Sequence, residues 1–167
     1  MTHNMLKTSG NTEYYTPPKI IEAARRAMYW IQLDPASSEV ANKIVGAETI
    51  YTKDDDGLSL DWFGTVWMNH HFGRSQNAAW VNKLIAAYTN GNVNEACCIT
   101  YACTSEKWFQ PLMEFPQCFL FPRTNYLLPD GSVKRGAQKG SVVTYLGDNN
   151  NVFISEFSGL GRVKVLA

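Results

Sequence analysis

The sequence predicts an α/β fold with a mostly parallel sheet and antiparallel strands toward the C-terminus. Helix-type and strand-type patterns alternate along the first two thirds of the chain, which favours parallel strands joined by helices. Strand-type patterns then dominate, which favours antiparallel pairing. At 167 residues and 45% hydrophobic content, the chain can form one domain with a substantial core. We expect this single domain to span 13–167, after a flexible N-terminal stretch over 1–12.

Helices and short strands alternate in the first half. Thr16 is a good N-cap, Pro17 suits the first helical position, and apolar residues then recur at helical spacing. The small residues after Asp34 would let a ligand approach the backbone. The elements expected here are a helix over 17–31, a strand ending at Leu33, a helix from Ser37 or Ser38 to about Ile44, and strands over 48–51 and 65–69.

The second half contains one clear amphipathic pattern and several buried-type strands. Apolar residues at helical spacing begin at Asn77 and stop near Asn90-Gly91, a typical helix end. A turn-rich run over 147–151 separates two short apolar stretches that we interpret as strands. The elements expected here are a helix over 77–87, a strand over 96–101, a helix starting at Thr104, and strands over 118–121, 142–146 and 152–154.

Composition and charge limit the classes of protein to consider. The formal net charge is zero, so no global basic field attracts nucleic acid, although a local basic face can serve instead. No apolar run reaches membrane-spanning length, and the first seven residues lack the apolar core of a signal peptide. We therefore expect a soluble, cytoplasmic protein.

The cysteines and adjacent histidines do not form a metal-binding pattern. No two cysteines have the C-x-x-C spacing, and Cys97 and Cys98 would point to opposite faces of a strand. Buried free thiols in a reducing compartment are the expected state of all four cysteines. His70 and His71 are adjacent, but the remaining ligands of a metal site are missing, so we expect no metal.

The most informative stretch is the strand over 65–69 with the loop that follows it, Asn69-His70-His71-Phe72. In open α/β sheets, ligands bind at the carboxyl ends of the strands. An asparagine amide can accept hydrogen bonds from an exocyclic amine, and an aromatic ring nearby can stack on a base. We interpret this loop as a site for an adenine. The alternative is an ordinary turn at the end of a strand.

Four separated segments, taken in order, carry a family resemblance: Tyr14–Pro18, Leu33–Ser38, Tyr51–Leu58 and Val66–Arg74. Together they resemble the phage-type, Dam-like DNA N6-adenine methyltransferases, over about residues 13–147. The resemblance implies a Rossmann-like methyltransferase fold that transfers a methyl group from S-adenosylmethionine to the N6 amine of adenine in double-stranded DNA, with the base flipped out. It also implies a cytoplasmic location, in the bacterial host if the protein is phage-encoded.

The resemblance also assigns roles to residues. The sulfonium is already a reactive methyl donor, so the protein has only to desolvate and align the amine. The acceptors for that amine would be Asn69 Oδ1 and the backbone carbonyl of His70, with Phe72 stacking on the base and His71 completing the loop. The implied cofactor-binding residues are Tyr15, Thr16, Pro17, Asp34, Pro35, Ala36, Ser37, Asp55, Asp56 and Asn69. Asp55 and Asp56 belong to the acidic run Asp54-Asp55-Asp56, and which of these aspartates contacts the cofactor stays open.

This chain departs from the family at the catalytic loop. The family's loop reads Asn-Pro-Pro-aromatic, whereas this one reads Asn69-His70-His71-Phe72. Prolines fix φ and carry no N–H, so two histidines restore backbone freedom and two donors. Three outcomes stay open: an active adenine methyltransferase, a related transferase with a different acceptor, and a homologue that binds S-adenosylmethionine or nucleic acid without turnover.

DNA contacts would come from the chain after the catalytic strand. Arg74 directly follows the loop and could meet a phosphate. The segment over 122–140 is turn-rich and basic, and we interpret it as a short target-recognition loop; a solvated hairpin connection is the alternative. Its candidate DNA-binding residues are Arg123, Lys134, Arg135 and Lys139.

Overall fold

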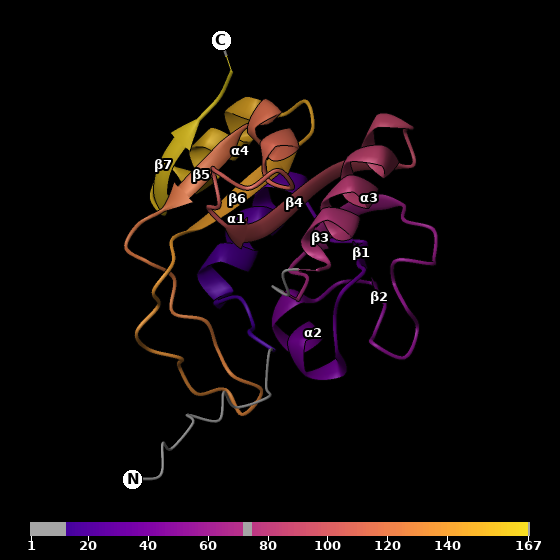
Figure 1. Ribbon diagram of the computed structural model, residues 1–167, viewed down its shortest axis with the longest axis horizontal. Coiled ribbons are helices and arrows are strands. Elements are labelled where there is room, and N and C mark those ends of the chain that lie inside the picture. Colours follow the sequence, from indigo (N-terminus) through magenta and orange to yellow (C-terminus); the bar gives the residue numbers. More distant parts are fainter. Residues whose placement is uncertain (1–12, 72–74, 167) are drawn as a thin grey trace, which may run out of the picture.

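A seven-stranded mixed sheet forms the centre of the structure, a computed structural model that describes residues 13–71 and 75–166 (Figure 1). The order of the strands across the sheet is β2-β1-β3-β4-β6-β5-β7. The strands are β1 (Leu33–Asp34), β2 (Thr49–Ile50), β3 (Gly64–Met68), β4 (Val93–Tyr101), β5 (Gln117–Leu120), β6 (Ser141–Leu146) and β7 (Gly161–Lys164). The helices are α1 (Pro18–Met28), α2 (Glu39–Val45), α3 (Asn77–Thr89) and α4 (Asn150–Phe157), with a 3₁₀ helix, η1, over Gln110–Glu114.

The pairing of neighbouring strands changes from parallel to antiparallel at β4. β2, β1, β3 and β4 are mutually parallel, whereas β6 is antiparallel to β4, and β5 and β7 continue the antiparallel pairing. The predicted α/β class, with a parallel core and antiparallel C-terminal strands, is confirmed at this level.

Helices cover both faces of the sheet. Alternate residues of β3 and β4 point to opposite sides, so Trp67 and Cys97 pack with α1 and α4, while Met68 and Cys98 pack with α3. The predicted opposite orientation of Cys97 and Cys98 is therefore confirmed. All four cysteines are free thiols, but only Cys97, Cys98 and Cys118 are buried as predicted, and Cys103 is partly exposed. In the described part of the chain, no helix is long and apolar enough to cross a membrane.

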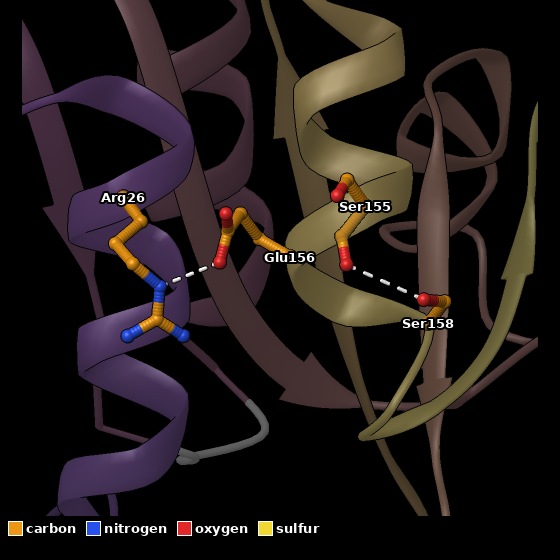
Figure 2. A network of polar contacts seen from close by, with 4 residues as sticks. All are labelled: Arg26, Ser155, Glu156 and Ser158. Atoms are coloured by element: carbon orange, nitrogen blue, oxygen red, sulfur yellow. Dashed lines mark hydrogen bonds and ion pairs between the residues drawn. The ribbon is translucent and has the colours of Figure 1, made fainter.

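On one face, α1 and α4 lie beside each other. Figure 2 shows the Arg26 Nε of α1 donating to Glu156 Oε2 of α4 at 2.5 Å. The Arg26 side chain is more than half exposed, so this ion pair adds little stability. Buried apolar side chains, including Phe153 and Phe157 of α4, hold the two helices against the sheet.

Several predicted elements were wrong or displaced. The helix expected from Thr104 is only the 3₁₀ helix η1, because Pro111 lacks an N–H and disfavours the α conformation before it. The strand expected at 152–154 is part of α4, since Phe153 and Phe157 lie one turn apart on its buried face. β7 was not predicted. Pro17, not Thr16, is the N-cap of α1.

Candidate functional site

A cavity of about 380 Å³ opens at the carboxyl ends of β1 and β3, within the size range of small-molecule sites. β1 and β3 are parallel neighbours, so the residues that leave them meet at one edge of the sheet. The N-terminal segment before α1 forms a third wall. Residues lining this first cavity include Tyr14, Tyr15, Thr16, Asp34, Ala36, Ser37, Ser38, Asp54, Asn69, His70 and His71.

The Asn69 amide is oriented by the N-terminal segment. Its Nδ2 donates to the Tyr14 carbonyl at 2.8 Å and to the Thr16 hydroxyl oxygen at 3.1 Å. A backbone carbonyl can only accept, so the amide must turn its NH₂ group toward Tyr14. Neither hydrogen bond uses Oδ1, which therefore keeps its capacity to accept from a ligand donor. Thr16 serves this purpose instead of capping the helix.

Asp34 is a buried carboxyl group at the end of β1, and its side chain is 2% exposed. Burial raises its pKa to about 7, because the charged form loses hydration. The Ala36 N–H donates to Oδ1 at 3.2 Å and opposes the rise. The Ser37 hydroxyl also lowers the pKa, although its geometry falls short of a normal hydrogen bond. A cationic ligand here would favour the carboxylate.

Tyr15 links the N-terminal segment to the start of α2. Its hydroxyl donates to Glu13 Oε2 at 3.0 Å and lies 3.2 Å from the Ser38 Oγ. Because the single Tyr15 proton is used on Glu13, Ser38 is the donor to Tyr15. Ser38 Oγ also accepts from the Ala41 N–H at 3.0 Å and caps α2. The predicted capping by Ser37 or Ser38 is thus confirmed for Ser38.

The acidic loop after β2 reaches the cavity through Asp54. Asp55 instead accepts from the N–H and the hydroxyl of Thr52, both at 2.8 Å, and these hydrogen bonds lower its pKa. Asp56 does not line the cavity either. Gly57 lets the loop lie against β1, since a Cβ there would come within 2.1 Å of the Pro35 carbonyl oxygen.

His70 and His71 leave β3 in different directions. The His70 ring is 1% exposed and stacks near Trp80 of α3, with ring centroids 6.1 Å apart. Its Nε2 lies 2.8 Å from Asn77 Oδ1, so this nitrogen carries the proton and donates. Burial lowers the His70 pKa to about 4, so the ring is neutral at pH 7. His71 is exposed and lines the first cavity.

The basic segment after β5 pairs with the N-terminal segment. Tyr15 and Leu127 exchange two backbone hydrogen bonds of 2.8 Å, so this segment lies against the chain that leads into α1. A second cavity, of about 350 Å³, lies beneath this segment. Three predicted DNA-binding residues line it: Lys134, Arg135 and Lys139.

The structure gathers eight of the predicted site residues around the first cavity: Tyr15, Thr16, Asp34, Ala36, Ser37, Asn69, His70 and His71. It does not bring Pro17, Pro35, Asp55 or Asp56 into the lining. Arg123 lies outside both cavity linings and donates to the Ala137 carbonyl at 3.3 Å. The predictions for Phe72, Arg74 and 1–12 fall outside the described residues.

Two contributors were missed. Tyr14 acts through its carbonyl and Asn77 through a contact between two elements, neither of which has a signature in the sequence. The sequence left open which aspartate of Asp54-Asp55-Asp56 contacts a ligand, and in the fold Asp54 is the one that lines the cavity. In the described part of the chain, no three His, Cys, Asp or Glu side chains are grouped to hold a metal.

Comparison with known families and with curated proteins finds no match to the chain.

Proposed function

We propose that the first cavity binds S-adenosylmethionine and that the protein methylates the N6 amine of adenine in DNA. The observation that carries the proposal is the Asn69 amide, whose Nδ2 is held by Tyr14 and Thr16 while Oδ1 remains able to accept from an amine. This amide lies in the same cavity as the buried Asp34. The order of the four family-like segments supports the same assignment.

The cavity lining fits the proposed cofactor. S-adenosylmethionine is a cation at its sulfonium and its ammonium, and four carboxyl groups line the cavity, on Glu13, Asp34, Glu39 and Asp54. Lys53 is available for the cofactor's carboxylate, and hydroxyl-bearing side chains can meet its ribose. When bound, the cofactor supplies an activated methyl group, so no nucleophilic side chain is needed.

The chain's own residues would bind and orient the acceptor amine. Adenine's amine is a weak nucleophile because its lone pair is delocalised into the ring. Asn69 Oδ1 and the His70 carbonyl would accept its two hydrogens and draw electron density back onto nitrogen. Where the family has two prolines, the buried His70 ring is anchored by Asn77 and Trp80. This anchoring gives the loop an alternative source of rigidity.

The test is transfer of a labelled methyl group from S-adenosylmethionine to unmethylated double-stranded DNA. N6-methyladenine in the recovered DNA, with saturable cofactor binding by calorimetry, is the expected result. Absence of cofactor binding would reject the proposal.

A second candidate is a protein that binds S-adenosylmethionine or nucleic acid without turnover, favoured by the two N–H groups that His70 and His71 add to the loop. Cofactor binding with no methylated adenine would support this candidate, provided that the His70→Pro/His71→Pro variant also stays inactive. Mass spectrometry of the same DNA checks for another methylated base, the product expected from a transferase with a different acceptor.

A further inference from the structure

The second cavity is lined by aromatic rings and cations. Tyr14, Tyr101 and Tyr126 line it together with Lys134, Arg135 and Lys139, and none of the lining residues among those that the structure describes carries a carboxyl group. The first cavity, by contrast, is lined by four carboxyl groups. The two cavities therefore favour ligands of opposite charge, and a phosphate belongs in the second one.

The rings of the second cavity are held in fixed positions. Tyr126 is buried, its hydroxyl lies 2.8 Å from Ser141 Oγ, and its ring meets that of Tyr101 edge-on with centroids 6.5 Å apart. The Tyr14 and Tyr126 centroids are 6.2 Å apart. Lys139 Nζ lies 5.3 Å from the centroid of Tyr101. A base-sized ring could stack against tyrosine while the cations contact its phosphate.

Tyr14 connects the two cavities. It lines both of them, and its carbonyl accepts from the Asn69 amide. The Lys134 N–H donates to the Tyr126 carbonyl at 2.7 Å, so the basic segment is hydrogen-bonded to the aromatic wall. A polynucleotide with one residue in the first cavity would thus find a cationic, aromatic subsite next to it.

We propose that the second cavity binds one nucleotide of a DNA strand next to the target adenine, with its base on the tyrosines and its phosphate on Lys134, Arg135 and Lys139. The role as neighbour of the target rests on the proposed function; nucleotide binding itself does not. The site is distinct from the first cavity in charge and in lining, apart from Tyr14.

The test is fluorescence anisotropy with a labelled 12-nucleotide thymidine oligomer, which contains no adenine. The Arg135→Ala/Lys139→Ala variant should bind at least tenfold more weakly than the parent, with a log–log salt slope smaller by about 1.4 for two lost phosphate contacts. Arg162→Ala/Lys164→Ala on β7 removes the same two charges from exposed positions outside the cavity and should change affinity less than twofold. Equal losses in the two variants would overturn the proposal.

A second variant separates stacking from charge. Tyr101→Leu should weaken oligomer binding roughly 5- to 100-fold with the salt slope unchanged, and Tyr101→Phe should retain most of the affinity. Circular dichroism of each variant checks that it is folded. Free thymidine monophosphate should compete poorly; competition as strong as the oligomer's, per nucleotide, would identify a free nucleotide as the ligand and overturn the polynucleotide assignment.

Cofactor binding distinguishes this proposal from the proposed function. The Arg135→Ala/Lys139→Ala variant should bind S-adenosylmethionine as the parent does, because these residues are absent from the first cavity. A parent protein that binds the oligomer but not the cofactor would reject the methyltransferase and keep the nucleotide site. A parent that binds cofactor but not the oligomer would reject the nucleotide site alone.

Discussion

The two cavities share Tyr14 but differ in the interactions with which they would hold a ligand. The first is built around the buried Asp34, whose protonation is set by desolvation, and the partly buried Asn69, whose orientation is set by hydrogen bonds. The second is built from exposed cations around partly buried rings. Buried interactions are weakly screened by salt, whereas exposed charges are strongly screened. Ligand binding in the first cavity should therefore depend mainly on the placement of its hydrogen-bonding groups, whereas binding in the second should depend on ionic strength.

The largest effect expected in the first cavity follows from Asn69→Ala. Loss of the acceptor Oδ1 should lower kcat for methyl transfer by about 10²- to 10³-fold, as for other single groups that stabilise developing charge. The affinity for S-adenosylmethionine should change only a few-fold. Single-turnover transfer and calorimetry measure the two quantities.

Thr16→Val is the control for Asn69→Ala. It removes one acceptor of Nδ2 and leaves the Tyr14 carbonyl, so its loss of rate should be much smaller. Equal losses of rate and cofactor affinity in Asn69→Ala would contradict the assigned role.

Asp34→Asn should have the next largest effect. Removing the carboxylate should weaken cofactor binding by roughly 10- to 100-fold, the worth of a charge-assisted hydrogen bond. In the parent, affinity should rise from pH 6 to pH 8, because the carboxyl group, with a pKa of about 7, loses its proton over that range. The variant should lose this dependence. Calorimetry at several pH values provides the measurement, and a parent affinity independent of pH would contradict it.

Asp34→Asn should raise the free energy of unfolding at pH 8, although it weakens cofactor binding. The folded-state pKa lies above the ordinary value of 3.8, so the folded state holds the proton more tightly and stability falls as pH rises from about 4 to 7. At pH 8 the variant should be more stable than the parent, by at most about 4 kcal/mol. Urea unfolding at pH 8 tests the sign.

The sequence predicted the parts of the first cavity better than their contacts. Asp34 ends β1 and Asn69 directly follows β3, so their place at one edge of a parallel sheet was predictable. The hydrogen bond from Asn69 to the Tyr14 carbonyl joins positions 55 residues apart and leaves no local pattern. The basic segment over 122–140 was predicted from its composition, but the backbone pairing of its Leu127 with Tyr15 was not. Short apolar runs such as 152–154 fit both a strand and a helix.

Asn77→Ala tests the anchoring of the loop in the first cavity. It leaves the buried Nε2–H of His70 without its acceptor, so the free energy of unfolding at pH 7 should fall by about 1–3 kcal/mol. Asn151→Ala, at an exposed position of α4, should change it by less than about 0.5 kcal/mol. Similar values for the two variants would show that the contact to His70 adds no stability.

His70 also makes the stability of the parent depend on pH, with a sign opposite to the contribution of Asp34. Its folded-state pKa of about 4 lies below the ordinary 6.5, so the unfolded chain takes up the proton first as pH falls. This group therefore destabilises the fold progressively from pH 6.5 down to pH 4. His70→Gln should remove that component, and urea unfolding across this range measures it. An unchanged pH profile in the variant would contradict the assignment.

The smallest expected effect, and the most direct comparison of the two cavities, is that of salt. Raising NaCl from 50 to 200 mM should lower thymidine-oligomer affinity by at most about 20-fold if three cations contact phosphates, and by less if fewer do. S-adenosylmethionine affinity should fall less steeply than oligomer affinity, because Asp34 is buried away from mobile ions, although Glu39 and Asp54 of the same lining are exposed. If cofactor affinity fell as steeply as oligomer affinity, the cofactor would be held by exposed charges, and the contrast between the two sites would fail.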